Sequence, residues 1–194
     1  MNRNIKDYLL CKKNFLSEKT CEMYITELKK EAWKKHFWYS RGTDSMETPA
    51  GDNEPEVFEK NMFSKNIVKI NDLIVKNLHS AITEYVKILN LDWFLGCDES
   101  SAIKFIRYFP GQTMQRHCDH IQSLFDGKRK GIPILSIIGL LNDDYEGGEL
   151  IMFGDKKIDT KKGDLWIFPS NFLYPHEITP VIKGVRYSYV SWAW

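Results

Sequence analysis

The chain has 194 residues and a formal net charge of +1, with 43% hydrophobic and 27% charged residues. This length suits one domain with a sizeable core, and the near-neutral charge gives no electrostatic reason to expect a nucleic-acid partner or a membrane surface. The aromatic content of 13% argues against an intrinsically disordered chain.

The sequence carries no sign of export. No apolar run approaches the roughly 20 residues needed to cross a bilayer, and the first ten residues lack the apolar stretch of a signal peptide. The four cysteines form no CxxC pair, which favours reduced thiols over a disulfide framework. We therefore expect a cytoplasmic protein without a membrane partner, and the compact chain suits a bacterial or phage cytoplasm.

The first half of the chain reads as helical. Ser17 is a plausible N-cap for an amphipathic helix that runs to about His36, and a polar segment at 41–59 reads as a long surface loop. Apolar residues at helical spacing predict a second, longer helix at 67–89.

From Ala102 onward the period changes to that of strands. Short β-branched and aromatic runs alternate with turn residues, and the runs are AIKFIRYF, PILSIIGLL, GELIMF, KIDT, DLWIFP, HEITPV and RYSYVSWAW. This spacing predicts an antiparallel sandwich or barrel, and helices followed by strands indicate an α+β fold. We expect one domain over 1–194, with a helical support in 1–100 and the catalytic β-core in 101–194.

Three side chains of the second half suit a metal ion. His117 and Asp119 lie two residues apart, so in extended backbone both face the same side. His176, in a later strand-like run, would complete a facial set of two histidines and one carboxylate. Such a set leaves the other metal positions open, as non-haem Fe(II) oxygenases require.

Arg186 suits the binding of a carboxylate. On a strand it shares a face with Ser188, and a planar guanidinium with a nearby hydroxyl offers several donors to a carboxylate such as the remote end of 2-oxoglutarate. Each residue alone is a weak signal, since a single His-x-Asp, histidine or arginine is more often structural. Their order along the chain makes the case.

The segments RYFPGQTMQRHCDH, LLNDDYEGGELIMF and KKGDLWIFPSNFLYPHEITPVIKGVRYSYVSWAW together resemble the prolyl-4-hydroxylase-like branch of the Fe(II)/2-oxoglutarate-dependent dioxygenase superfamily. The resemblance covers about 102–194 and implies a double-stranded β-helix, a jelly-roll or cupin-like barrel braced by the N-terminal helices. It implies that His117, Asp119 and His176 bind Fe(II). Arg186 and Tyr108 would hold 2-oxoglutarate, with Ser188 assisting.

The resemblance also implies an activity. 2-Oxoglutarate and O₂ would be consumed, with ascorbate as a possible helper, while succinate and CO₂ leave and a C–H bond of the substrate is hydroxylated. A prolyl residue in a peptide or protein is the leading substrate. Retention of Asp119 favours hydroxylation over halogenation, and Leu140 stands where some animal relatives place a tyrosine near the co-substrate.

Other residues near the site receive weaker functional interpretations. His120 would face away from the metal in regular extended backbone, and Cys118 fits a small buried apolar residue. His36 and His79 fall in predicted helices, and Trp192 could line the pocket. The 41–59 loop and the loop at 121–132 flank the expected mouth, where each could be a substrate lid or a solvated loop.

Several alternative functions remain open. A free amino acid or another small molecule could be the substrate in place of a peptide. A nucleic-acid demethylase ranks low because no second arginine follows Arg186 in YSYVSWAW. A non-catalytic cupin-like binding module would be expected to lack one of the four key residues, and a zinc hydrolase would leave Arg186 and Tyr108 without a purpose.

Overall fold

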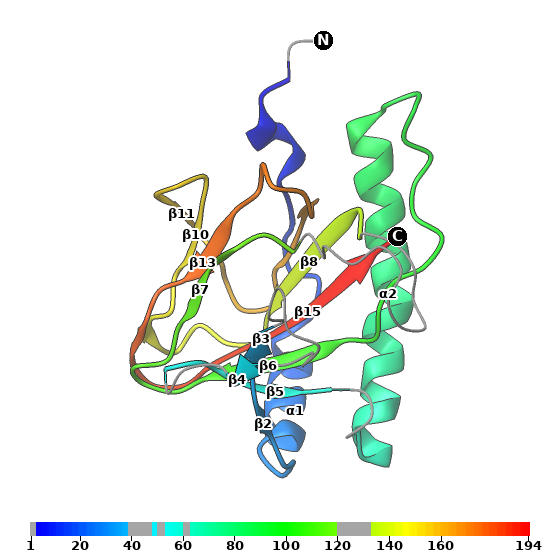
Figure 1. Cartoon of the computed structure of the whole chain (residues 1–194). Coiled ribbons are helices and arrows are strands. Elements are labelled where there is room, and N and C mark those ends of the chain that lie inside the picture. The colour runs from blue at the N-terminus through cyan, green and yellow to red at the C-terminus, as the bar shows by residue number, and fades with distance from the viewer. Residues whose placement is uncertain (1–2, 39–47, 50–52, 60–62, 120–132) are drawn as a thin grey trace.

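The computed structural model describes residues 3–38, 48–49, 53–59, 63–119 and 133–194. These residues form mostly antiparallel sheets, accompanied by two α-helices and one short 3-10 helix (Figure 1). The helices are η1 (Ile5–Tyr8), α1 (Glu18–Leu28) and α2 (Lys65–Leu89).

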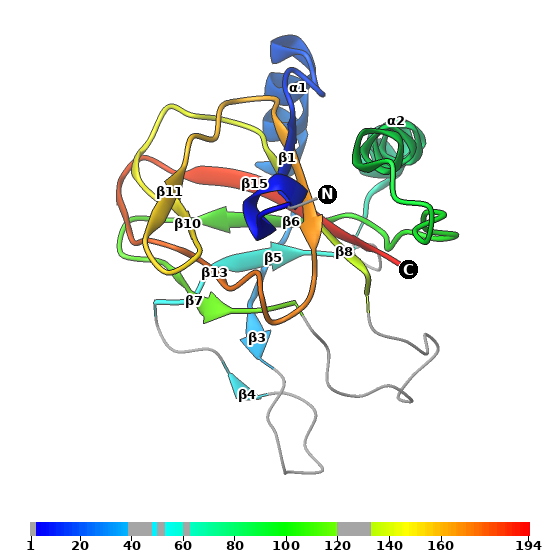
Figure 2. The ribbon, with the colours of Figure 1, turned by 90° about the horizontal axis from the view of Figure 1, so that it is seen from above.

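Helix α2 confirms the prediction at 67–89 and begins only two residues earlier. Ser64 caps its first turn by accepting a hydrogen bond from the backbone N–H of Ile67. The helix ends at Leu89, and its C-cap Asn90 has a φ of 47°, a left-handed conformation that asparagine tolerates. Its apolar stripe is buried in the same core as the outer face of the large sheet, so the helix covers that face (Figure 2).

Helix α1 begins where predicted but ends sooner. Ser17 is its N-cap and accepts a hydrogen bond from the N–H of Thr20. The predicted extension to His36 is wrong, because the helix stops at Leu28 and the chain then forms strand β2 (Lys34–Lys35), which pairs with β5 (Glu56–Phe58). His36 therefore lies outside any helix. A long-range strand pairing has overridden the local helical pattern.

The larger sheet has seven antiparallel strands in the order β1-β12-β8-β15-β6-β5-β2. The strands not yet given are β1 (Leu10–Lys12), β12 (Leu165–Pro169), β8 (Leu135–Leu140), β15 (Arg186–Ala193) and β6 (Lys104–Tyr108). Strands β1, β2 and β5 come from the first hundred residues and were not predicted. The segment at 41–59 is thus not entirely loop, because β5 lies within it.

The smaller sheet has four antiparallel strands in the order β11-β10-β13-β7. They are β11 (Lys156–Ile158), β10 (Leu150–Met152), β13 (His176–Ile178) and β7 (Met114–His117). Two further pairs are β14 (Val181–Lys183) with β9 (Glu146–Gly147), and β3 (Phe37–Trp38) with β4 (Thr48–Pro49). Every strand-like run predicted after Ala102 contains a strand, and the run HEITPV contributes to two of them.

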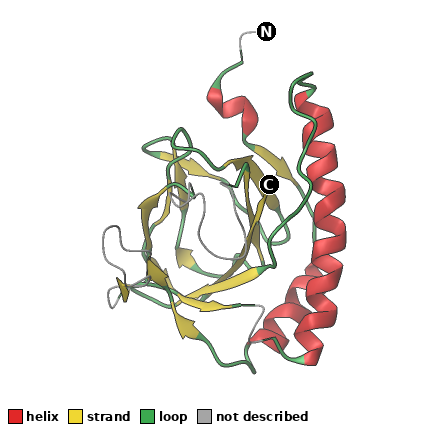
Figure 3. Ribbon diagram, turned by 45° about the vertical axis from the view of Figure 1, so that its right-hand side comes forward, coloured by secondary structure: helices red, strands yellow, loops and turns green. Residues whose placement is uncertain are grey.

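Side-chain alternation along β8 divides the core in two. Leu135 and Ile137 pack with the helices, whereas Ile138 belongs to a cluster with Leu150 and Ile178 of the smaller sheet. The second cluster therefore lies between the two sheets, on the side away from the helices (Figure 3). Inward-facing residues of β15 and β6 point into this space.

The described part of the chain contains no helix that is both long enough and apolar enough to cross a membrane.

Gly163 provides a test of the packing between the N-terminal segment and the large sheet. Its φ is +83°, and a Cβ there would lie 2.3 Å from the carbonyl oxygen of Leu16. Gly154 has a φ of +95° but open space around it. We expect Gly154→Ala to cost about 1–3 kcal/mol from backbone strain alone. Gly163→Ala should cost roughly 1–3 kcal/mol more, because the clash with backbone adds to the strain.

Urea unfolding followed by circular dichroism would measure both variants. Equal midpoints for the two variants would contradict the close approach of Gly163 to Leu16.

Candidate metal centre

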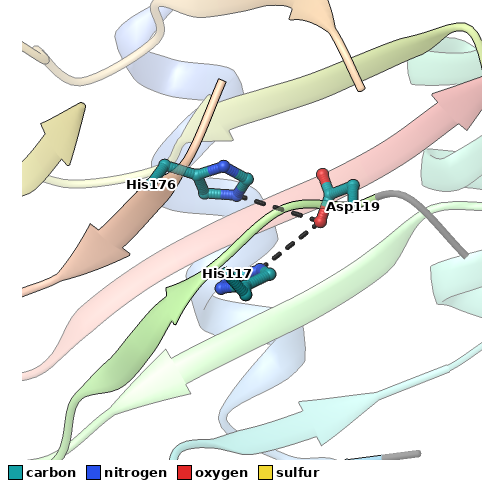
Figure 4. Close-up of side chains that lie close together, drawn as sticks. All are labelled: His117, Asp119 and His176. Carbon is teal, nitrogen blue, oxygen red and sulfur yellow. Dashed lines mark ion pairs between the residues drawn. The ribbon is translucent and has the colours of Figure 1, made fainter. Parts of the chain in front are cut away.

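Three potential metal ligands come together at neighbouring strands of the smaller sheet. His117 is the last residue of β7, Asp119 follows two residues later, and His176 opens β13 directly opposite His117. One oxygen of Asp119, Oδ1, lies 3.4 Å from Nε2 of His117 and 3.8 Å from Nε2 of His176 (Figure 4). One potential ligand atom from each of the three residues lies within 4.8 Å of the other two.

Backbone carbonyls orient both imidazoles. Nδ1 of His117 lies 2.7 Å from the carbonyl oxygen of Gln115, and Nδ1 of His176 lies 3.1 Å from that of Tyr174. Because a carbonyl can only accept, each Nδ1 carries the proton, which leaves the Nε2 lone pair of the neutral ring facing Asp119. A hydrogen bond from the far ring nitrogen to a carbonyl fixes the tautomer and the orientation in which a histidine can bind a metal.

The protonation states also suit a cation. Burial would raise the pKa of Asp119, but His176, His117 and the hydroxyl of Ser136 together hold it far below its usual range. Burial and the charge of His117 lower the pKa of His176, although Asp119 opposes them. For His117 burial lowers the pKa, yet the contacts with Asp119 outweigh it and the pKa is raised. An ionised carboxylate beside two imidazoles is a donor set that fits Fe(II).

A second polar site lies on the larger sheet. Arg186 opens β15, is 1% exposed and stands opposite Tyr108 of β6. Its guanidinium carbon lies 5.1 Å from the centre of the Tyr108 ring, and its Nη1 donates to the hydroxyl of Ser188 at 2.8 Å. Its Nε and Nη2 are buried without a hydrogen-bond partner in the described part of the chain. Buried donors of this kind call for an acceptor, and a carboxylate supplies two.

Gly148 makes room for Arg186, which sequence reasoning missed. A Cβ at Gly148 would lie 3.0 Å from Cδ of Arg186 and 3.0 Å from Cγ2 of Val181. Its φ of +59° also favours glycine at this position. No local signal reveals the contact with Arg186, since β15 is far away in the sequence.

Leu140 stands where some animal relatives have a tyrosine, and its position in the sheet is defined. It is buried and lies opposite Ser188 in the register of β8 and β15. At this position the chain therefore offers an apolar side chain opposite Ser188 and no hydroxyl.

The other residues that were considered from the sequence differ in their positions. Cys118 is half-buried, and so is more exposed than the fully buried residue we expected. Trp192 is half-buried opposite Ser136, with Nζ of Lys104 5.7 Å from its ring centre. His79 is exposed on α2. His120 and the 121–132 loop lie outside the described residues, as does most of 41–52.

The chain is similar to several known proteins. The sequence model of the 2OG-Fe(II) oxygenase superfamily matches residues 103–194. A PKHD-type hydroxylase of Alteromonas mediterranea is 34% identical over 95 residues, which are 45% of this chain and 41% of that protein. A probable prolyl 4-hydroxylase of Arabidopsis thaliana is 25% identical over 206 aligned positions, covering 92% of this chain and 66% of that protein. The chain thus spans less than half of the PKHD-type relative.

A solved structure supports the fold. A prolyl hydroxylase from Trichoplax adhaerens, in complex with a hypoxia inducible factor peptide fragment, superposes with a TM-score of 0.69 at 17% identity. The superposition covers 97% of this chain and 84% of that one. Residues 103–194 thus match the 2OG-Fe(II) oxygenase superfamily, and the fold of the chain is similar to that of prolyl hydroxylases.

Proposed function

We propose that the chain is an Fe(II)- and 2-oxoglutarate-dependent dioxygenase that hydroxylates an unactivated C–H bond of a prolyl residue in a peptide or protein, releasing succinate and CO₂. One observation carries the proposal: Arg186 lies fully buried with two donor atoms that have no partner among the described residues, in a fold whose other sheet clusters His117, Asp119 and His176. A cation site and a buried anion site in one core match the two ends of 2-oxoglutarate bound to iron.

In this proposal His117, Asp119 and His176 would hold Fe(II) through three protein atoms, which leaves other coordination positions for small molecules. When bound, the iron would supply the activation of O₂ and the oxidation of co-substrate and substrate. The protein's own part is to fix the ligands and to shield them from water.

The far carboxylate of 2-oxoglutarate would sit against Arg186. Burial raises the pKa of Tyr108 to about 12, so its hydroxyl stays protonated and can donate a hydrogen bond. Ser188, which accepts from Arg186, keeps its own hydrogen for the same carboxylate. Ile106, Ile138 and Leu140 line the inner face of the sheet nearby and exclude water.

The finer fold and domain assignment belong to the same proposal. We infer that the two sheets make up a double-stranded β-helix, that 101–194 is its catalytic core, and that the helices brace it within a single domain. The helices and the outer face of the large sheet share one apolar cluster, which supports this reading.

The proposed substrate class is supported by the names of similar proteins. The Arabidopsis relative is named as a probable prolyl 4-hydroxylase, and the Trichoplax protein was solved with a peptide fragment. A prolyl residue in a peptide or protein is therefore the substrate to test first.

The first experiment measures succinate formed from 2-oxoglutarate with Fe(II) and ascorbate, with and without proline-containing peptides. Turnover should rise with a peptide and should be lost in His176→Ala, because that change removes one of the three clustered ligands. His79→Ala, on an exposed position of α2, is the control and should retain turnover. Succinate formation in the presence of free proline but of no peptide would overturn the assignment of a peptide substrate. No turnover under any condition would overturn the proposed dioxygenase activity.

Metal affinity should depend on pH. Protonated histidine cannot bind a metal, and the contact with Asp119 raises the pKa of His117. Affinity for Co(II), measured by calorimetry, should therefore be lower at about pH 6 than at about pH 8. Equal affinity at both values, or full affinity in His176→Ala, would contradict the assigned ligands.

Arg186→Met separates co-substrate binding from stability. Methionine fills similar space without a buried charge, so the variant free of co-substrate should unfold at the same temperature as the native protein or higher. Its affinity for 2-oxoglutarate should fall roughly 100-fold or more, since two charge-assisted hydrogen bonds are lost. Calorimetric titration and thermal unfolding test both effects.

Arg107→Met is the control for this change. Arg107 pairs with Glu56 at 2.5 Å, so its replacement should leave 2-oxoglutarate binding unchanged. Unaltered binding in Arg186→Met would remove Arg186 from the co-substrate site.

A further inference from the structure

The backbone at Arg186 is held differently on its two sides. On one side Arg186 pairs with Tyr108 of β6, within a regular antiparallel ladder. On the other side the pairing of β15 with β8 ends at Ser188 and Leu140, two residues short of Arg186. The regular ladder on that side therefore does not reach the residue that carries the guanidinium.

A side-chain amide continues the ladder where β8 ends. In a hydrogen-bonded antiparallel pair, two opposite residues exchange both of their backbone bonds. Leu141 donates its N–H to the carbonyl of Tyr187 at 3.0 Å, but the N–H of Tyr187 donates to Oδ1 of Asn142 at 2.7 Å. Nδ2 of Asn142 in turn donates to the carbonyl of Val185 at 2.7 Å. The amide of Asn142 thus bonds to the backbone on both sides of Arg186.

Asn142 is itself firmly placed. It is 7% exposed, and its Nδ2 also donates to Oδ1 of Asp144 at 2.6 Å. The turn that follows Asn142 packs closely against the residues before Arg186: Gly184 has a φ of +80°, and a Cβ there would lie 3.0 Å from the carbonyl oxygen of Asp144. An amide that uses both of its donors and its acceptor, in a close-packed turn, has little freedom to move.

The guanidinium of Arg186 depends on this backbone for its position. Its Nη1 donates to the hydroxyl of Ser188, whereas Nε and Nη2 have no hydrogen-bond partner among the described residues. Hydrogen bonds from side chains therefore fix the group only in part, and the position of its own backbone decides where the two remaining donors point. A displacement of about 1 Å would spoil their alignment with a bound carboxylate.

We propose that Asn142 is a positioning residue for the carboxylate clamp, and that it fixes the backbone around Arg186 so that the guanidinium points at the far carboxylate of 2-oxoglutarate. This inference rests on the proposed function, because it concerns the co-substrate assigned there. Both donors of the Asn142 amide bond to protein atoms. Asn142 therefore acts through Arg186 and not by donating to the ligand.

Ser191 offers a matched control on the same strand. It is 0% exposed, and its hydroxyl donates to the carbonyl of Ser101 at 3.0 Å. By strand alternation it shares a face of β15 with Tyr189, which packs in the cluster with the helices. Asn142→Ala and Ser191→Ala thus each remove a buried side chain that ties β15 to a neighbouring segment, and only the first removes bonds to the backbone beside Arg186.

The test compares three dissociation constants, each measured by calorimetry. They are those of Co(II), of 2-oxoglutarate for the Co(II)-loaded protein, and of 2-oxobutanoate, which is 2-oxoglutarate without its far carboxylate. Asn142→Ala should weaken 2-oxoglutarate binding about 10-fold or more, because misaligned charge-assisted hydrogen bonds are lost. Its affinities for Co(II) and 2-oxobutanoate should stay at the native values. Ser191→Ala should leave all three constants unchanged, even if it lowers the unfolding temperature as much.

A double-mutant cycle tests whether Asn142 acts through Arg186. In the Arg186→Met background the guanidinium is absent, so Asn142→Ala should cause little further loss of 2-oxoglutarate affinity. The same factor of loss in the native and Arg186→Met backgrounds would mean that Asn142 acts elsewhere, and the positioning role would be wrong.

The remaining results separate two failures. Native 2-oxoglutarate affinity in Asn142→Ala, or an equal loss for 2-oxobutanoate or in Ser191→Ala, would overturn the positioning role and leave the proposed function intact. No binding of 2-oxoglutarate by the native Co(II)-loaded protein, or binding that Arg186→Met does not weaken, would overturn the proposed co-substrate site itself.

A second variant covers the case in which Asn142→Ala does not fold. Asn142→Asp has the same shape and still accepts from the N–H of Tyr187, but at neutral pH it cannot donate to the carbonyl of Val185. Its affinity for 2-oxoglutarate should also fall while its affinity for Co(II) stays native. Native affinity for 2-oxoglutarate in this variant would contradict the proposal.

Discussion

A buried positive charge that has no ion-pair partner among the described residues constrains the rest of this structure. Arg186 is 1% exposed, and the described residues supply its guanidinium with one hydroxyl and one aromatic face but no ion pair. An uncompensated buried charge costs on the order of 3–5 kcal/mol. The fold must recover that cost elsewhere, and the two apolar clusters on either side of the large sheet are its main means of doing so. The folded state is therefore less stable than it could be, because it keeps an anion site preformed.

Each of the two sheets supplies different residues of the site. The smaller sheet supplies the metal-type ligands, two from β7 and β13 and one just beyond β7, while the larger sheet supplies Arg186, Ser188 and Tyr108 from β15 and β6. Neither sheet alone could bind a molecule with a chelating end and a remote carboxylate. The distance between the two groups depends on how the sheets pack, so the apolar residues between them influence binding without touching the ligand.

Sequence reasoning predicted which side chains lie together but not the contacts that hold them. His117 and Asp119 were found from their spacing, and Arg186 with Ser188 from strand alternation, because these patterns are local. Gly148 was missed, since it matters through Arg186, which is distant in the sequence. The same limit explains the fold. Helix α2 was predicted because its periodicity is long, whereas α1 was overextended and β5 was missed because the β2–β5 and β5–β6 pairings are not local.

The charges of the site also explain why its parts lie apart. Asp119 is ionised and therefore attracts a cation, while Arg186 requires an anion. If the two were adjacent they would form an ion pair and satisfy each other, and neither would bind a ligand. Because Arg186 lies on the larger sheet and Asp119 follows a strand of the smaller one, the two leave room for a molecule that binds metal at one end and carries a carboxylate at the other. Ile106 and Ile138 on the inner face between them keep water away, so both electrostatic interactions remain strong. Separation of opposite charges across an apolar interior is therefore the physical basis of the proposed selectivity for a dicarboxylate.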